Sequence, residues 1–256
     1  MKVSVLASGS KGNSTYISTK DLDLLIDLGP TCLYIENKLK ELDVEPKNIK
    51  AVLITHTHSD HTKGLRVFYK KYNPKIYLTK KMYDDLSMEF EITNYCLIEK
   101  DFNIENTHIK VVKTSHDASD SNAYVVEEDN KSVVYITDTG FINQKFFNVL
   151  KNRNVYIMES NHDIEMLLNG RYPYHLKQRV LSDRGHLSNI DSAHYLKEFI
   201  GKDTKKIFLA HLSEENNTYE KAINTLKGVL EEHDIKFDDI EIAKQNEKTE
   251  LINLWK

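Results

Sequence analysis

The sequence is poor in the residues that mark disulfide scaffolds and flexible linkers. Its 256 residues include only two cysteines, Cys32 and Cys96, which form no CxxC pair, so a disulfide framework is not expected. There are 9 glycines and 4 prolines, and no Ser/Gly/Pro-rich linker, low-complexity tract or internal repeat. We therefore expect one domain over residues 1–256, which is long enough for a full hydrophobic core.

Long apolar runs are also missing. No run approaches the ~20 residues that a membrane-spanning helix needs. The apolar patch at Met1–Gly9 is too short for a secretory signal and is better explained as a strand. The composition, 40% hydrophobic and 29% charged, is typical of a globular protein, and we expect a cytoplasmic location and no membrane partner. The net charge of -4 argues neither for nor against a nucleic-acid partner.

Three histidines and a carboxylate are concentrated in residues 55–61, Thr-His-Thr-His-Ser-Asp-His, directly behind a short apolar run. That run reads as a buried strand. His56 and His58 are two residues apart, so in an extended segment they project to the same side. Asp60 and His61 follow at or before the first turn of the next predicted helix. One metal ion can therefore take the first two histidines, and a second can take the Asp-His pair.

Three later strands end in residues of the same chemistry. The apolar segments that end at Ser115, Thr137 and Ala210 lead directly to His116, Asp138 and His211. Strand ends at one edge of a sheet sandwich can gather ligands that are far apart in sequence. Neutral imidazole and carboxylate suit Zn, Mn, Fe or Co, so the ligand types alone do not choose the metal.

Hydrophobic periodicity predicts two groups of strands, each followed by helices. This order suggests two sheets packed face to face with helices outside. Strands are predicted at Lys2–Ala7, Thr15–Thr19, Leu24–Asp27, Ala51–Ile54, Ile76–Leu78, Cys96–Ile98, His108–Val112, Ala123–Val126, Val133–Thr137, Val155–Met158 and Ile207–Ala210. Helices are predicted at Pro30–Leu42, Lys63–Tyr72, Lys80–Phe90, Asn143–Lys151, Ile164–Asn169, Pro173–Ser182, Asp191–Ile200 and Thr218–Glu232, with Asn189 or Asp191 as the N-cap of the seventh.

The pattern H-x-H-x-D-H behind a strand resembles the signature of the metallo-beta-lactamase superfamily, and the later His, Asp and His resemble the rest of its ligand series. The resemblance implies an α/β (α+β) fold, a four-layer αββα sandwich, and two divalent metal ions, Zn or Mn with Fe as an alternative. It implies one ion on His56, His58 and His116, the other on Asp60, His61 and His211, and Asp138 as the bridging carboxylate. A metal-bridged hydroxide would be the nucleophile. Asp60 either orients it or serves only as a ligand.

Longer motifs resemble the WalJ/YycJ (VicX) family of that superfamily. They are the segments 8–14, 114–118, 159–163, 172–173, 184–189 and 210–217. The resemblance covers nearly the whole chain and implies a metal-dependent nuclease that degrades DNA from 5′ to 3′. Asp138 and His211 are 73 positions apart (211 − 138), which leaves no room for the β-CASP insertion of RNA-processing relatives, so a more open groove is expected.

Several polar residues outside the ligand series are candidates for substrate contact. Residues 8–14, Ser-Gly-Ser-Lys-Gly-Asn-Ser, form either a loop whose backbone N–H groups bind an anion or a generous hairpin turn. His186 is predicted to contact the scissile phosphate or to protonate the leaving oxygen, and the alternative is a supporting histidine near a helix start. Candidates for binding phosphate are Ser8, Ser10, Lys11, Asn13, Ser188 and Asn216, and those for a basic groove are Lys11, Lys63, Arg66, Lys177, Arg179 and Arg184.

The remaining histidines carry weaker signals. His108, His175, His194 and His233 are interpreted as structural or exposed, and His162 is left open between support of a metal ligand and plain packing. For the whole chain, the favoured function is a phosphodiesterase acting on nucleic acid, with DNA as the expected partner. One alternative keeps the metals and changes the substrate to a small phosphodiester, a thioester or a lactam. A non-enzymatic alternative is a regulatory protein of a two-component cell-wall signalling pathway.

Overall fold

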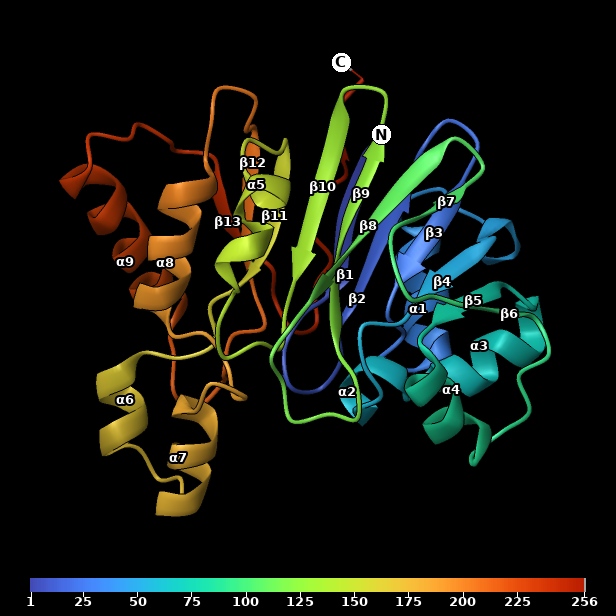
Figure 1. The fold of residues 1–256 in the computed structure, drawn as a ribbon, viewed down its shortest axis with the longest axis horizontal. Helices are drawn as coiled ribbons and strands as arrows, with labels where there is room; N and C mark the ends of the chain where they lie inside the picture. Colours follow the sequence, from blue (N-terminus) through green and yellow to red (C-terminus); the bar gives the residue numbers. More distant parts are fainter. Residues whose placement is uncertain (256) are drawn as a thin grey trace.

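The chain forms two seven-stranded sheets that pack face to face (Figure 1). The computed structural model describes residues 1–255. The first sheet has the order β14-β1-β2-β3-β4-β5-β6. Its first three strands in sequence form an antiparallel meander, and β3 to β6 run parallel. The strands are β1 Lys2–Ala7, β2 Ser14–Ser18, β3 Asp23–Ile26, β4 Ala51–Leu53, β5 Lys75–Leu78, β6 Tyr95–Leu97 and β14 Ile252–Asn253.

The second sheet repeats this plan with the order β13-β12-β11-β10-β9-β8-β7. Strands β7 to β10 are antiparallel neighbours, and β10 to β13 run parallel. The carboxyl ends of the parallel strands of a sheet lie at one edge, where loops can present side chains together. The strands are β7 Phe102–Ile104, β8 Thr107–Lys113, β9 Asn122–Glu128, β10 Lys131–Ile136, β11 Val155–Glu159, β12 Lys206–Ala210 and β13 Ile240–Ile242.

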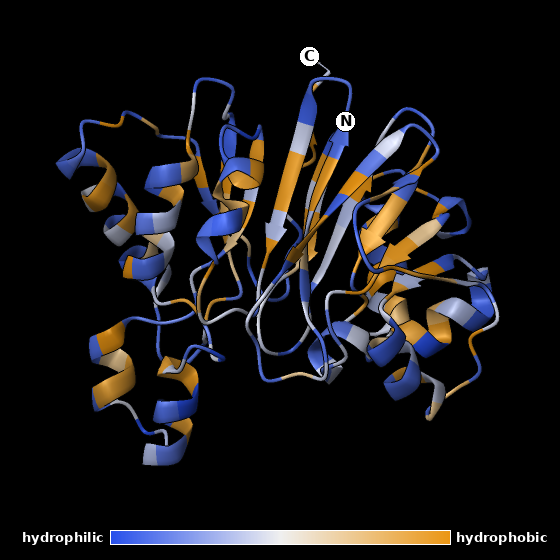
Figure 2. Ribbon diagram, viewed as in Figure 1, coloured by the Kyte–Doolittle hydropathy of each residue, from blue (hydrophilic) through white to orange (hydrophobic). Residues whose placement is uncertain are grey.

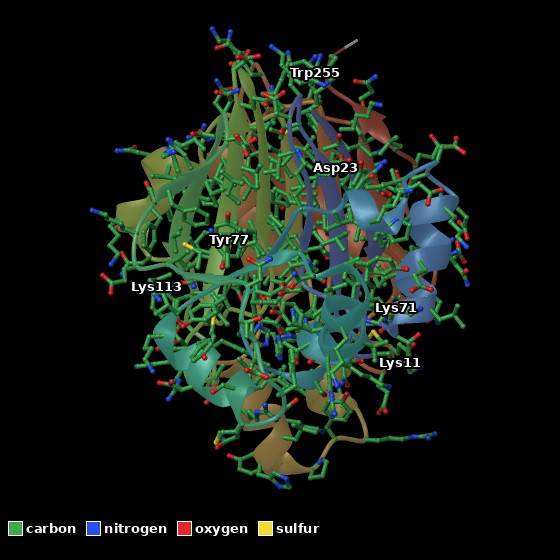
Figure 3. The ribbon with its side chains drawn as sticks, turned by 90° about the vertical axis from the view of Figure 1, so that its right-hand side faces the viewer. Lys11, Asp23, Lys71, Tyr77, Lys113 and Trp255 are labelled. Atoms are coloured by element: carbon green, nitrogen blue, oxygen red, sulfur yellow. The ribbon has the colours of Figure 1, made fainter. Side chains whose placement is uncertain are left out.

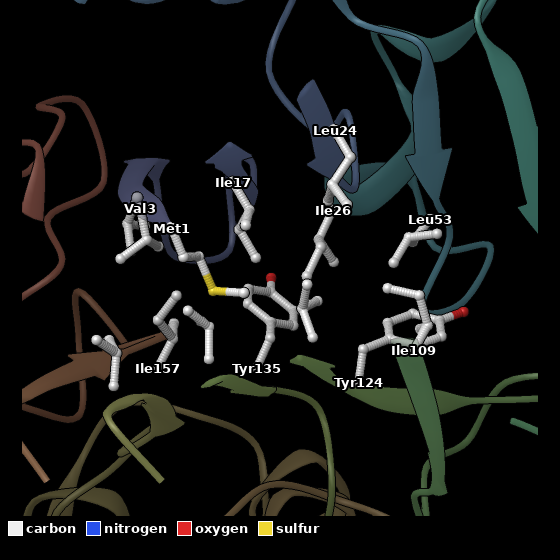
Figure 4. Packing of buried hydrophobic residues seen from close by; sticks show 14 of the residues in the cluster. Met1, Val3, Ile17, Leu24, Ile26, Leu53, Ile109, Tyr124, Tyr135 and Ile157 are labelled. Atoms are coloured by element: carbon white, nitrogen blue, oxygen red, sulfur yellow. The ribbon is translucent and has the colours of Figure 1, made fainter. Parts of the chain in front are cut away.

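Apolar side chains from the facing sides of both sheets fill the space between them (Figure 4). Leu24 and Ile26 come from the first sheet, and Tyr135 and Ile157 from the second. Tyr124, which is fully buried, donates its hydroxyl hydrogen to the carbonyl of Ile54 at 2.6 Å. This bond ties the second sheet to the backbone just before the histidine cluster.

Helices cover the outer face of each sheet, which completes the predicted αββα sandwich (Figures 1 and 2). The first sheet packs against α1 Cys32–Lys40, α3 Leu65–Tyr72 and α4 Lys80–Ser87, and the second against α5 Phe147–Leu150, α8 Asn189–Phe199 and α9 Tyr219–Glu232. Two further helices, α6 Ile164–Asn169 and α7 Tyr174–Leu181, project beyond the end of the second sheet (Figure 1). The short helices are α2 Ser59–Thr62, η1 Pro46–Asn48 and η2 Gln144–Phe146. None of the helices within residues 1–255 is long and apolar enough to cross a membrane.

The helix predicted over Lys63–Tyr72 begins earlier and is interrupted, so Asp60 and His61 lie within the separate short helix α2. The interruption has a hydrogen-bonding cause. The N–H of Gly64 donates to the carbonyl of Leu28 at 2.8 Å, and the carbonyl of Asp60 accepts from the N–H of Asn13 at 2.8 Å. These two tertiary bonds replace the helical bond between residues 64 and 60 and bring α2 against the exits of β1 and β3.

Two other predictions need correction. The N-cap of α8 is Ser188, whose hydroxyl accepts from the N–H of Asp191 at 3.1 Å, rather than Asn189 or Asp191. The predicted helix Asn143–Lys151 is broken into η2 and α5. Strands β7, β13 and β14 were not predicted, because each has only two or three residues and carries little periodicity. In addition, β13 and β14 pair with strands that are distant in sequence.

Candidate metal centre

Six strands deliver acidic or imidazole side chains to one edge of the sandwich. β4, β8, β10 and β12 lead to His56, His116, Asp138 and His211, as the sequence predicted. In addition, β3 leads to Asp27 and β11 ends in Glu159.

Three of these strands end in a left-handed backbone conformation. The residues are Asp27, Asp138 and His211, with φ values of 61°, 56° and 54°. A non-glycine residue in this conformation costs about 1–3 kcal/mol and is common at functional sites. Here it turns the chain sharply as the strand ends, so that a buried side chain at that position faces the other strand ends.

The first group of ligands consists of His56, His58 and His116, whose ligand nitrogens lie within 4.8 Å of one another. Nδ1 of His58 is 3.3 Å from Nε2 of His116. Nδ1 of His116 donates to the carbonyl of Gly185 at 3.2 Å, and Nδ1 of His56 lies 3.1 Å from the hydroxyl of Thr55. These contacts leave Nε2 of His56 and of His116 directed at the space between the three rings. Burial lowers the pKa of both rings, which favours the neutral imidazole that a metal ion requires.

Gly185 makes the contact to His116 possible. A Cβ at this position would lie 2.1 Å from the carbonyl oxygen of Val180, at the end of α7. Only glycine lets this loop pass so close to the helix. The same close approach sets the position of the following residue, His186.

The second group consists of Asp60, His61, Asp138 and His211, again with ligand atoms within 4.8 Å. Oδ2 of Asp60 is 3.5 Å from Nε2 of both His61 and His211. Asn13 also reaches this group, with Nδ2 3.0 Å from Nε2 of His61. The loop 8–14 therefore lies beside the centre.

Asp138 touches both groups. Its Oδ2 is 3.0 Å from Nε2 of His61. Its Oδ1 is 3.6 Å from Nε2 of His211 and 3.7 Å from Nε2 of His116. The carboxylate is therefore positioned between the predicted ligands of one ion and those of the other.

The donor set fits divalent metal ions. Within residues 1–255, Nε2 of His56 and Nε2 of His211 are buried and have no hydrogen-bond partner. A buried polar atom without a partner is rare because its desolvation is not compensated. Imidazole nitrogens and carboxylate oxygens in such a cluster are suited to Zn, Mn or Fe, and a bound cation would satisfy both nitrogens.

Two buried carboxylates outside the predicted ligand set hold the histidines in place. Oδ2 of Asp27 is 2.7 Å from Nδ1 of His61, while its Oδ1 accepts from the N–H of Thr55 at 2.8 Å. Oε1 of Glu159 accepts from Nδ1 of His211 at 3.0 Å and from Nδ1 of His186 at 2.8 Å. Such partners fix the tautomer and orientation of a ligand histidine. Both carboxylates stand at the ends of predicted strands, which was the signal that could have found them.

The charges of the metal-free centre are strongly coupled. Burial alone would lower the pKa of His211, but Asp138, Asp60 and Glu159 outweigh it and raise the pKa to about 10. The pKa of His61 is likewise held well above its usual value by Asp138 and Asp27. Burial raises the pKa of Asp138, yet these histidines bring it well below the usual range. Without metal, protons on the two histidines balance the buried carboxylates.

A cleft of about 250 Å³ opens onto these groups. His186 lines it, and because its Nδ1 is held by Glu159, Nε2 is the nitrogen available to a substrate. Tyr172, Leu176 and Arg179 line the side formed by α7 and the segment before it. Arg179 also pairs with Asp117.

The six candidate phosphate-binding residues differ in position. Ser10 and Asn216 line the cleft. Lys11 forms an exposed ion pair with Glu214 at 2.6 Å. Ser8 and Asn13 are buried, and the hydroxyl of Ser8 accepts from the N–H of His211 at 2.7 Å. Ser188 is buried as the cap of α8, so a direct phosphate contact from Ser8, Asn13 or Ser188 gains no support from this placement.

The other basic and imidazole candidates are dispersed. Arg184 donates to the carbonyl of His116, and Lys177 donates to the carbonyl of Leu168, while Lys63 and Arg66 are exposed near α3.

His162 is buried, and burial lowers its pKa to about 4. His108 bonds to Asn103 and His233 to the carbonyl of Val229, and His175 and His194 are exposed.

Comparison with known proteins agrees with this architecture. Residues 7–211 match the model of the metallo-beta-lactamase superfamily. The chain is 39% identical over 241 residues to exodeoxyribonuclease WalJ of Streptococcus pneumoniae, with 91% of this chain and 90% of the relative covered. It is also 39% identical over 236 residues to exodeoxyribonuclease YycJ of Bacillus anthracis, with 90% and 89% covered. The chain belongs to the WalJ/YycJ family of the metallo-beta-lactamase superfamily.

A solved structure of the superfamily shares the whole fold. The metallo-beta-lactamase fold protein YhfI from Bacillus subtilis aligns over 97% of this chain and 98% of its own, with a TM-score of 0.73 and 18% identity. In this chain, the segment between Asp138 and His211 contains η2, α5 to α8, β11 and the whole of β12. It therefore folds as part of the core sandwich, with α6 and α7 added.

We expect Asp27→Asn to weaken metal binding by about 10- to 100-fold. His61 and the N–H of Thr55 meet different oxygens of Asp27, and the amide replaces one of these oxygens with an NH₂ group, so one of the two donors loses its acceptor. Metal retention against a chelator would measure the effect. Asp129→Asn is the matched control, since that carboxylate is 56% exposed and pairs with Lys20. Equal retention by both variants would contradict a supporting role for Asp27.

We expect metal binding to release protons. The raised pKa values of His211, about 10, and of His61 mean that both rings are protonated at neutral pH in the metal-free protein. A cation must displace these protons, so apparent affinity rises as pH increases towards the folded-state pKa and falls as pH decreases. Calorimetric titration with Mn²⁺ in two buffers of different ionisation enthalpy measures the release. Binding without proton release would contradict the protonated state of His61 and His211 in the metal-free protein.

Proposed function

We propose that this protein is a metal-dependent DNA exonuclease that digests from the 5′ end and uses two divalent ions, Zn or Mn. The observation that carries the proposal is Asp138, which contacts two groups of ligands in a chain 39% identical to exodeoxyribonucleases. We also propose that it acts in the cytoplasm.

The residues divide into three roles. His56, His58 and His116 would hold one ion, Asp60, His61 and His211 the other, and Asp138 would join them. Two bound cations supply an activated water at neutral pH and stabilise charge on the attacking and leaving oxygens of a displacement. Asp60 is 21% exposed towards the cleft, so it can also orient the attacking water.

His186 is the candidate general acid. Glu159 accepts from its Nδ1, which fixes the ring and leaves Nε2 free to contact a phosphate oxygen or to protonate the leaving oxygen. The side chain is 19% exposed, so it meets the cleft without being free to rotate into solvent. Arg179 also lines the cleft, where its guanidinium pairs with Asp117.

The first test is a time course on end-labelled, 5′-phosphorylated DNA, single and double stranded, with metal-stripped protein reconstituted with Mn or Zn. Stepwise shortening from the 5′ end that requires metal supports the proposal. Shortening from the 3′ end would overturn the polarity. Absence of cleavage by fully metallated protein would direct attention to a small phosphodiester, thioester or lactam substrate, or to a regulatory role.

Asp138→Ala is expected to abolish hydrolysis, because it removes the carboxylate that contacts both ligand groups. Turnover and metal content should be measured on the same preparation. Retained turnover at normal metal content would refute the two-ion assignment. Loss of both turnover and metal is consistent with a bridging ligand.

His186→Ala is expected to retain metal and to lower the rate by roughly 100-fold or more, as general-acid loss predicts. His194→Ala is the matched control, since that histidine is exposed on α8. Metal content separates the alternatives. If His186→Ala loses metal, His186 is a ligand together with Asp138, Glu159 and His211, which is a grouping that the geometry also allows.

A further inference from the structure

A second cavity, of about 330 Å³, opens beside the metal cleft. Its wall is built from three segments that are far apart in sequence: the exit of β1, the segment from Leu212 to Tyr219, and the segment after β13 with Ala243 and Gln245. Nothing in the metal chemistry above uses this space.

The cavity and the cleft share a wall. Ser213 lines both, and the ligand His211 precedes it by two residues. Ser8, which lines the cavity, accepts the backbone N–H of His211 at 2.7 Å. A molecule in the cavity would therefore lie across the segment 211–213 from the metal ligands.

The lining of the cavity includes one aromatic and two apolar side chains. Leu212 and Ala243 are buried. Tyr219, the first residue of α9, lies at its margin and is 48% exposed. A half-exposed aromatic side chain beside a nuclease cleft is suited to stacking on a nucleobase. Any of the four bases can stack in this way, because each has a π-face.

The amides of the cavity are already engaged within the protein. Asn217 donates to the carbonyls of Ser160 and Asn161, and its oxygen accepts from Asn189. Gln245 accepts from the N–H of Lys11 at 2.9 Å and donates to the carbonyl of Gly12 at 3.1 Å. These side chains have little capacity left to read the edge of a base, so recognition here would depend on shape and stacking.

Glu214 lines the cavity and pairs with Lys11 at 2.6 Å, so its charge is already balanced within the protein. The scissile phosphate would stay with the metal ligands, while the sugar and base of the terminal nucleotide enter the cavity. The volume lies at the lower end of the ~300–1,000 Å³ range of small-ligand sites, which suits one nucleoside and not a continuing strand.

We propose that this cavity binds the sugar and base of the terminal nucleotide of the DNA, the one released on each cleavage, with Tyr219 stacked on its base. The proposal rests on the exonuclease function proposed above. Tyr219 would then be a specificity residue for chain ends. The cavity has room for a single sugar and base, so a nucleotide inside a long strand could not place its base there, because the strand has to continue on both sides of that nucleotide.

The test compares two oligonucleotides that differ in the terminal residue from which digestion starts, one with a base and one abasic. For the wild-type protein, we expect kcat/KM to be roughly ten-fold lower for the abasic end, within the range of one base–aromatic stack. Tyr219→Ala should lose roughly ten-fold on the normal end and little on the abasic end, since the contact is already missing there. Tyr219→Phe, which keeps the ring, should restore the wild-type ratio.

Two controls complete the design. Trp255→Ala removes an exposed aromatic ring far from Lys11 (Figure 3), and it should leave both rates unchanged. Hydrolysis of bis(p-nitrophenyl) phosphate reports on the metal centre without using the cavity, and Tyr219→Ala should not change it.

The possible results distinguish failure of the nucleoside site from failure of the exonuclease function. If Tyr219→Ala lowers kcat/KM equally on the two ends, or lowers it on neither, the nucleoside site is overturned. The exonuclease function still stands in that case, provided that the wild type digests DNA. If the wild type hydrolyses the small phosphodiester but neither oligonucleotide, the exonuclease function itself fails, and the nucleoside site with it.

Discussion

The structure depends on compensation of buried negative charge at one edge of the sandwich. Asp27, Asp138 and Glu159 are all buried, and Asp60 lies beside them. An isolated carboxylate in such a place costs several kcal/mol, so opposite charge must be present. Protons on His61 and His211 supply it in the metal-free protein, and metal ions would replace those protons. The same groups therefore serve the stability of the fold and the assembly of the centre.

The sandwich meets this requirement by ending strands from both sheets at the same edge. β3 and β4 belong to the first sheet, and β8, β10, β11 and β12 to the second. The left-handed residues Asp27, Asp138 and His211 turn the backbone directly behind a strand, which keeps each side chain within the rigid part of the fold. Conformational strain of this kind persists only where surrounding structure enforces it. Here the contacts between the carboxylates and histidines provide that enforcement.

The sequence predicted the strands that carry the ligands because these strands are apolar and well bounded, and because histidine is rare enough for a cluster to stand out. Asp27 and Glu159 escaped the ligand analysis, although both stand at strand ends. A single carboxylate after a strand has many ordinary roles, and only the sheet order shows that β11 lies between β10 and β12. That order is what allows Glu159 to reach His186 and His211 together.

Side chains whose function depends on tertiary neighbours were the hardest to predict. Ser188 reads as a plausible phosphate ligand from its motif, yet it caps α8 and donates to Asp191. Likewise, no local pattern joins Gln245 to residues 11 and 12, more than two hundred positions away. The cavity that includes Gln245 exists because the segment after β13 returns to the exit of β1, which periodicity does not reveal.

The segment that follows β12 links the two spaces of the proposed enzyme. His211 points to the metal groups, whereas the next residue, Leu212, contributes to the neighbouring cavity, so two consecutive residues face different spaces. Ser8 holds this segment by accepting the N–H of His211, and Asn161 donates to the carbonyl of the same residue at 2.9 Å. With its backbone fixed on both sides, the segment sets the distance between the cavity and the reacting phosphate. An exonuclease needs such a fixed spacing to cut one nucleotide from an end, because the terminal base and the scissile phosphate are separated by a constant length of backbone.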